Sequence, residues 1–331
     1  RETLGALMNV SESGITQLAQ LSLQISNPDV SLPFYTEKLG MTLLAERADG
    51  NETRYFLGFV QPGHQMTKHD FDPSAWQTRS YLELVHKRHD PELDVRKQPD
   101  VNEGYWKIAL SVSELDIAHA RLIKNGVEVD SPRQVGDIAY LCHFSDPDGY
   151  CIELIQHDFL QNHQSIPEDV SYALGSRPTF SLITYRVKDV EASLRFYTEF
   201  LGLRLLSVQP VPTREFTLYF LACTEEAPPH VNLEHVGNRE WLWQRPYTIV
   251  ELQHIWGTEK RNDFAYRTGA ESGFESISFA TRDLSALQDL AAQQNMTISV
   301  VESDSTLRAT TATVVDPDGY SVRLIDKAAE S

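Results

Sequence analysis

Three glutamates lie within short apolar runs of the kind that form β-strands. They are Glu83, Glu153 and Glu251. An unpaired carboxylate is costly to bury among apolar neighbours, so each side chain is expected to face a pocket. Carboxylates in such places can take up or release a proton, which is the chemistry of general acids and bases.

Two cations, Lys107 and Arg323, lie on runs of the same kind. Beside a buried carboxylate, such a cation supplies the charge that the carboxylate would otherwise lack. It can also stabilise an anion that develops on a substrate. Lys107 could instead extend its ammonium along the strand to solvent, and the sequence leaves this alternative open.

Two segments of the chain occur twice. Residues 31–40, SLPFYTEKLG, return at 193–202 as SLRFYTEFLG, and the DPDGY turn at 146–150 returns at 316–320. The two segments recur in the same order, and nearly the same number of residues separates the two copies of each. This pattern predicts a duplicated domain. The DPDGY segments are typical of hairpin turns.

The length of 331 residues suits about two domains. We predict domains at 15–156 and 178–327, joined by a linker at 157–177. Each half contains two modules in which a strand is followed by a helix and then by three strands. The predicted fold is α+β, with two tandem domains of two βαβββ modules each, and each domain forms a cupped mixed sheet.

Helix ends can be predicted from capping residues. Asn27 and Asp189 are expected to cap the first helix of each half, and Gly40 is expected to end the earlier one. Two long loops, 61–78 and 225–246, are candidate lids over a pocket, or surface segments packed by their own side chains. Their aromatic residues are Phe71, Trp76, Trp241 and Trp243.

Composition excludes some classes of partner. The net charge of −18 repels phosphate backbones and anionic lipids, and the sequence holds no compact Lys/Arg cluster. We expect a small-molecule ligand, no nucleic acid, no membrane, and a monomer or homodimer. The three cysteines include no CxxC pair, and the first residues lack a secretory pattern, so a cytoplasmic location is expected.

Four βαβββ modules with these landmarks resemble the vicinal oxygen chelate superfamily, which includes glyoxalase I, extradiol dioxygenases and bleomycin-resistance proteins. The resemblance covers about 17–327 and is greatest to glyoxalase I. The run ELQHIWGTE at 251–259 is similar to ELTHNWGTE of that enzyme, and RVKD at 186–189 is similar to its opening module.

The resemblance implies a cup around one divalent metal, held by the first and last strands of paired modules. The corresponding positions are Gln20, Glu83, Lys107, Glu153, Leu182, Glu251, Ser276 and Arg323. A retained Zn, Ni, Fe or Mn ion would take its ligands from Gln20, Glu83, Glu153 and Glu251.

Module pairing is left open by the sequence. Pairing within each half groups the first four positions and the last four. Exchanged pairing groups Gln20 and Glu83 with Ser276 and Arg323, and the other four together. In either case a Lys or Arg stands beside a Glu and opposes a divalent cation. We therefore expect no metal, and an ion pair between Lys107 or Arg323 and one of the three glutamates.

The resemblance implies an isomerase- or lyase-type enzyme that acts on a small oxygenated substrate. Glu83 or Glu153 would be the general base, and Lys107 or Arg323 would stabilise an enediolate-like anion. The expected substrate contacts are Trp106, Arg186, Glu251 and Ser276.

Glutathione-holding positions of glyoxalase I are only partly kept. Arg186 matches one of them, but its counterpart in the first half is Gln24, and Lys87 and Ile255 replace an asparagine. Conventional lactoylglutathione lyase activity is therefore not expected. An extradiol dioxygenase would need a His/His/Glu set that the C-terminal half does not have. The alternatives are a metal-free binding or sequestration protein of the bleomycin-resistance type, and an inactive relative kept for assembly.

Overall fold

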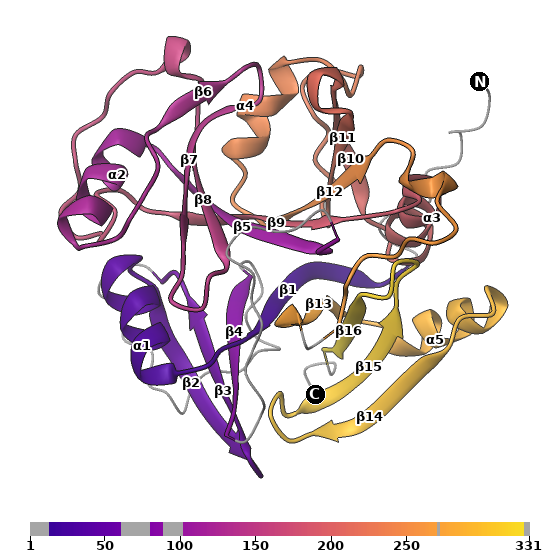
Figure 1. Ribbon diagram of the computed structural model, residues 1–331. Coiled ribbons are helices and arrows are strands. Elements are labelled where there is room, and N and C mark those ends of the chain that lie inside the picture. The colour runs from indigo at the N-terminus through magenta and orange to yellow at the C-terminus, as the bar shows by residue number, and fades with distance from the viewer. Residues whose placement is uncertain (1–12, 61–79, 89–101, 270–271, 328–331) are drawn as a thin grey trace.

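The computed structural model describes residues 13–60, 80–88, 102–269 and 272–327. These residues form two curled eight-stranded mixed sheets, the lower and upper sheets of Figure 1. The first sheet has the order β14 (Ile298–Asp304), β15 (Ala309–Val315), β16 (Ser321–Asp326), β13 (Phe274–Thr281), β1 (Ile15–Gln24), β4 (Tyr81–Lys87), β3 (Glu52–Gly58), β2 (Thr42–Asp49). The second has the order β10 (Arg204–Val211), β11 (Phe216–Ala222), β12 (Ile249–Ile255), β9 (Thr179–Arg186), β5 (Tyr105–Val112), β8 (Cys151–Gln156), β7 (Ala139–Ser145), β6 (Arg133–Val135).

The central seams decide which modules pair. Strand β1 pairs with β13 and β5 pairs with β9, both antiparallel. The first module therefore shares a sheet with the fourth, and the second with the third. This is the exchanged arrangement. The predicted α+β fold with two cupped mixed sheets is confirmed, but the prediction of one sheet for each half is wrong, because each sheet takes one module from each half.

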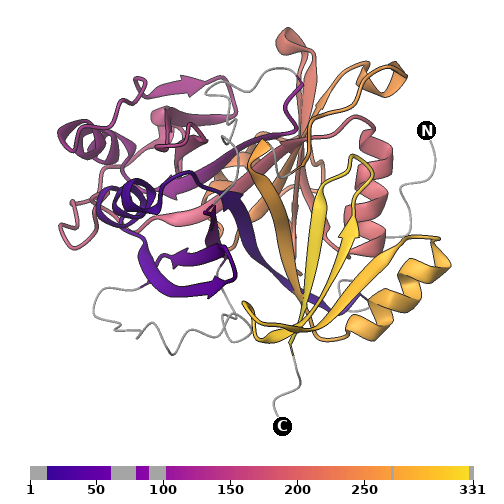
Figure 2. The ribbon, with the colours of Figure 1, turned by 60° about the horizontal axis from the view of Figure 1, so that its bottom comes forward.

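Five α-helices in the described ranges cover these sheets: α1 (Pro28–Pro33), α2 (Leu115–Lys124), α3 (Val190–Arg195), α4 (Gly237–Trp243) and α5 (Leu284–Gln293). Figures 1 and 2 show α1 and α2 on one side of the molecule, and α3 and α5 on the other. The predicted caps are present: Asn27 accepts from the backbone N–H of Asp29, and Asp189 accepts from those of Glu191 and Ala192. No helix in the described ranges is long and apolar enough to cross a membrane.

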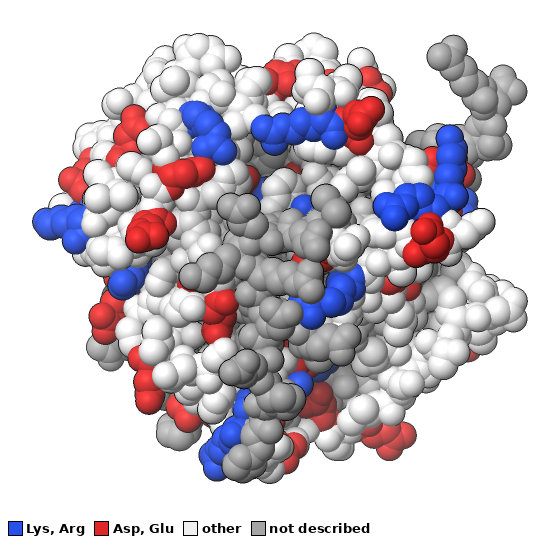
Figure 3. Space-filling model, viewed as in Figure 1, with Lys and Arg blue, Asp and Glu red and all other residues white. Residues whose placement is uncertain are grey.

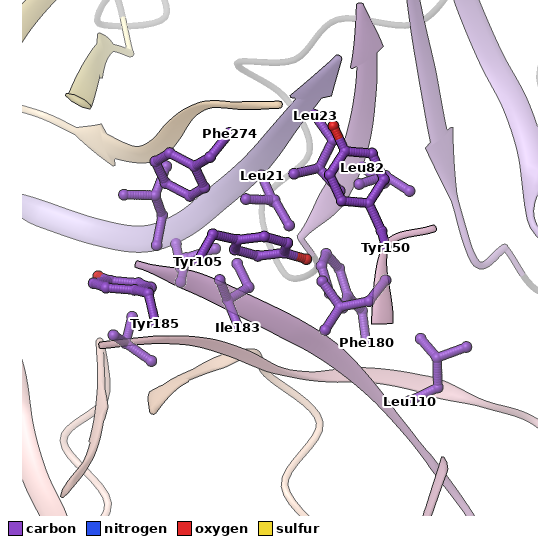
Figure 4. Packing of buried hydrophobic residues seen from close by; sticks show 14 of the residues in the cluster. Leu21, Leu23, Leu82, Tyr105, Leu110, Tyr150, Phe180, Ile183, Tyr185 and Phe274 are labelled. Carbon is purple, nitrogen blue, oxygen red and sulfur yellow. The ribbon is translucent and has the colours of Figure 1, made fainter. Parts of the chain in front are cut away.

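The main core lies between the two sheets. Leu21, Leu82 and Phe274 of the first sheet point toward Tyr105 and Ile183 of the second, as Figure 4 shows. These side chains are almost fully buried. Because this core occupies one face of each sheet, polar side chains on the other face are free to build sites. The predicted DPDGY turns join β7 to β8 and β15 to β16 as hairpins.

Candidate functional site

A cavity lies on the face of the second sheet that turns away from this core. Its walls are apolar and come from several strands and from α4: Ile138, Leu141, Leu182, Phe216, Leu218 and Trp243. Its polar lining includes Lys107, His143, Glu153 and Glu251, which we call its floor, together with Arg133 and Arg214. An apolar-walled cavity with a few convergent polar groups is the usual form of a small-molecule site.

Lys107 lies between two glutamates on this floor. Its Nζ atom is 2.7 Å from Oε1 of Glu153 and 3.4 Å from Oε2 of Glu251. Strand register explains the convergence, since Lys107 and Glu251 both lie opposite Thr184 of β9. All three charged side chains are at most 5% exposed. The predicted ion pair is present, and it involves two of the three glutamates at once.

Two further side chains complete the cluster. Nε2 of His143 is 2.7 Å from Oε2 of Glu153, and the Thr184 hydroxyl donates a hydrogen bond to Oε2 of Glu251. Neither residue was predicted from the sequence. His143 could have been found, because the hairpin around the DPDGY turn places it directly opposite Glu153.

The two glutamates of the cluster differ in pKa. Burial alone would raise the pKa of Glu153, but Lys107 and His143 lower it to about 2. Burial raises the pKa of Glu251, and the neighbouring Glu153 raises it further against the opposing effect of Lys107. Burial disfavours the charged form of Lys107, but the two glutamates raise its pKa above the ordinary value. Glu153 is thus a fixed carboxylate, whereas Glu251 is easier to protonate.

Trp106 lies beside the cluster. Its ring centroid is 4.8 Å from Nζ of Lys107 and 5.3 Å from Cζ of Arg186. Trp106 lines the cavity, whereas Arg186 does not appear among its described lining residues. Arg186 instead donates hydrogen bonds to the side chain of Gln253 and to the backbone carbonyl of Glu103.

The other candidate positions lie on the first sheet. Glu83 is fully buried and accepts hydrogen bonds from Arg54 at 3.0 Å, from the amide of Gln20 at 2.7 Å, and from the hydroxyl of Ser22. Arg54, which the sequence analysis missed, is therefore the cationic partner of Glu83. Ser276 and Arg323 lie on neighbouring strands of the same sheet.

One of the two predicted lid segments forms a wall of the cavity. Within it, α4 buries Trp243, whose indole N–H donates to the carbonyl of Ile138 at 2.9 Å and whose ring packs edge-on against Phe220. The loop at 61–78, with Phe71 and Trp76, lies outside the described residues.

Donors for a metal are sparse. Within 13–60, 80–88, 102–269 and 272–327, no group of three or more His, Cys, Asp and Glu side chains could hold a metal ion. In the second sheet the ammonium of Lys107 lies between the two carboxylates, and Leu182 offers no donor atom.

On the face shown in Figure 3, the described Lys and Arg side chains are scattered among Asp and Glu.

Comparison with known proteins gives a family match and several similar proteins. The model of the Glyoxalase/Bleomycin resistance protein/Dioxygenase superfamily matches residues 17–154 and 179–324. Lactoylglutathione lyase of Schizosaccharomyces pombe is 26% identical over 330 residues, which cover 97% of this chain and 100% of that protein. Glyoxalase I of Saccharomyces cerevisiae is 28% identical over 314 residues, 92% of this chain and 90% of that one. The crystal structure of glyoxalase I from Zea mays has a TM-score of 0.66 at 21% identity, covering 94% of this chain and 92% of that chain, which shows a shared fold.

Proposed function

Because this chain belongs to the Glyoxalase/Bleomycin resistance protein/Dioxygenase superfamily, we propose that it is a glyoxalase-I-like enzyme that moves a proton on a small α-hydroxy carbonyl compound without a metal. The observation that carries the proposal is Lys107, whose Nζ lies 2.7 Å from Glu153 and 3.4 Å from Glu251 on the floor of an apolar-walled cavity.

The donor set of this cavity does not suit a divalent metal. A metal ion between Glu153 and Glu251 would have to share that space with a buried ammonium, which repels it strongly in a site of low dielectric. The ammonium itself compensates the carboxylates. We therefore route no step through a metal, and we assign the electrostatic role to Lys107.

Glu251 is the better general base of the two carboxylates. Its pKa is raised, whereas the pKa of Glu153 is lowered to about 2. A base with a raised pKa accepts a proton more readily and can return it later. Among the described residues, hydrogen bonds to the Glu251 carboxylate reach Oε2, so Oε1 is the atom that would receive the proton. Glu153 then acts as a positioning residue that holds Lys107.

The proposed step conserves atoms and charge. The proton on the hydroxyl-bearing carbon passes to Glu251, and the electron pair of that C–H bond forms an enediolate whose oxyanion is stabilised by Lys107. Return of the proton to the former carbonyl carbon, with transfer of the hydroxyl proton between the two oxygens, completes an isomerisation. The cavity has a volume of about 80 Å³, so its apolar walls, with Leu182 and Trp243, would accommodate a short hydrocarbon substituent.

A second candidate function is binding without turnover. Lys107 is already neutralised by two carboxylates, and the walls include Trp243. A cavity of this kind could sequester a small apolar molecule, as expected for the bleomycin-resistance type.

Deuterium exchange separates the two functions. Hydroxyacetone, glyceraldehyde and 2-hydroxyacetophenone would be incubated with the protein in D₂O containing a chelator, and loss of the α-proton followed by NMR. We expect catalysed exchange of at least one compound, and a loss of 100-fold or more in Glu251→Gln. The matched control is Glu302→Gln, an exposed glutamate on β14. Exchange that the chelator abolishes, or that Glu251→Gln leaves intact, would refute the proposal. Tight binding without exchange would favour sequestration.

A further inference from the structure

The first sheet carries a different set of side chains where the second sheet has its ion cluster. In the second sheet Glu153 lies opposite Ala109, and in the first sheet Arg323 lies opposite Ser278 in the same relation. A negative charge on one sheet is thus replaced by a positive charge on the other. Lys107 has Ser276 as its counterpart by the same register.

Several polar atoms of this set are buried without partners. Of the buried side-chain atoms without a hydrogen-bond partner in the described parts of the chain, four belong to this set: Oε1 of Gln20, Oγ of Ser276, Oγ of Ser278 and Nη1 of Arg323. The two serines and Gln20 are at most 2% exposed. Buried polar groups in native proteins nearly always have a hydrogen-bond partner. The ion cluster of the second sheet, by contrast, is bonded within itself.

These atoms belong to one patch. Gln20 lies opposite Ser278 across the β1–β13 seam, and Ser278 lies opposite Arg323 across β13 and β16. Ser276 precedes Ser278 by two residues, so its side chain is on the same face of the strand. Three adjacent strands therefore present unpartnered donors and acceptors side by side. We call these four residues the Arg323 patch.

Arg323 is the one cation among the four residues of the Arg323 patch. Glu83 on β4 is paired with Arg54, which also contacts Glu52, and accepts a hydrogen bond from the Gln20 amide. Burial raises the pKa of Asp304 on β14, but hydrogen bonds within its own turn and the positive charge of Arg323 lower it. Nη1 of Arg323 is buried without a partner among the residues that the structure describes, so this side of the guanidinium is available to an anion.

The unpartnered atoms also indicate which polar groups a ligand would need. Nη1 of Arg323 is a donor, the two serine hydroxyls can donate or accept, and Oε1 of Gln20 is an acceptor only. A ligand that satisfies all of them needs an anionic group and a nearby hydroxyl. Ala280 and Ile325, two residues beyond Ser278 and Arg323, place apolar surface on the same face beside these atoms. We infer that the Arg323 patch is a second binding site, independent of the cavity on the second sheet, for a small α-hydroxy carboxylate.

Calorimetric titration of the full chain tests this site. Glycolate and L- and D-lactate would be the probes, with acetate and propionate as their counterparts without the hydroxyl. We expect saturable binding of a hydroxy acid, at least fivefold tighter than that of its deoxy counterpart. Arg323→Gln should weaken this binding tenfold or more. Ser278→Ala, which places the alanine of the second sheet at this position, should reduce the preference for the hydroxyl.

Arg308→Gln is the matched control, because Arg308 is an exposed arginine of the same module and its loss changes net charge equally. It should leave binding within twofold of the parent protein. Thermal unfolding of each variant would establish that it is folded. If Arg323→Gln does not fold, the binding measured with Ser278→Ala serves as the test. No saturable binding of any hydroxy acid, equal weakening in both arginine variants, or equal affinity for lactate and propionate would overturn the inference.

Discussion

The phenol of Tyr35 donates a hydrogen bond of 2.8 Å to Oδ2 of Asp146, and Tyr197 makes the same bond to Asp316. Each bond joins a helix that packs on one sheet to a hairpin turn of the other sheet. The two repeated sequence landmarks thus contact each other once in each half of the chain. The strands exchange partners between halves, whereas these buried contacts hold the two modules of each half together.

Tyr35→Phe should lower the free energy of unfolding by about 1–3 kcal/mol, because it removes a buried hydrogen bond and leaves Oδ2 of Asp146 without this donor. Oδ1 of Asp146 keeps the N–H groups of its own turn, so the hairpin should survive. Urea unfolding measures the change. Tyr197→Phe is the matched variant and should cost a similar amount; unchanged stability in both would show that the contact is not stabilising.

Stability should fall as the pH rises from about 4 to 7. Burial raises the pKa values of Asp146 and Asp316 to about 7. Between pH 3.8, the ordinary pKa, and pH 7, the folded chain keeps protons that the unfolded chain has released. The contribution of these two groups to the free energy of unfolding is therefore fully present below pH 4 and is lost by pH 7. Asp146→Asn with Asp316→Asn should flatten this slope, as measured by urea unfolding at several pH values. An identical slope in both proteins would contradict the assignment.

Sequence reasoning predicted the elements and the modules well because they depend on local signals. Capping by Asn27 and Asp189, and both DPDGY hairpins, follow from residues within a few positions of each other. The ion pair of Lys107 followed from the cost of burying a carboxylate alone.

Module pairing could not be predicted, since the β1–β13 seam joins residues more than 250 positions apart and the opening strands of all four modules have similar patterns. Arg54 was missed because only the pairing of β3 with β4 brings it near Glu83. His143 lies within a hairpin of predictable register and could have been placed opposite Glu153 from the sequence.

Lys107→Met should destabilise the fold by about 3–5 kcal/mol, because it leaves the carboxylates of Glu153 and Glu251 buried without their cation. Neutralising one of them, in Lys107→Met with Glu153→Gln, should recover part of the loss. Lys124→Met, at the exposed end of α2, is the matched control and should change stability by less than about 0.5 kcal/mol. If both lysine variants unfold at the same urea concentration, the ammonium does not support the cluster.

Added metal should not produce lactoylglutathione lyase activity in this protein. A mechanism that depends on a Lewis acid loses many orders of magnitude without one, and in the second sheet the place between the carboxylates is taken by Lys107. The measurement is isomerisation of the glutathione–methylglyoxal hemithioacetal with Ni, Zn or Co added, alongside a metal-requiring glyoxalase I as positive control. Robust turnover that metal stimulates would contradict this expectation, and the glutamate variants would then locate the site. Loss of that turnover in Glu83→Gln would place a metal on the first sheet. Loss in Glu153→Gln would place the metal on the second sheet. Lys107 would then have to move away from both carboxylates to admit the ion.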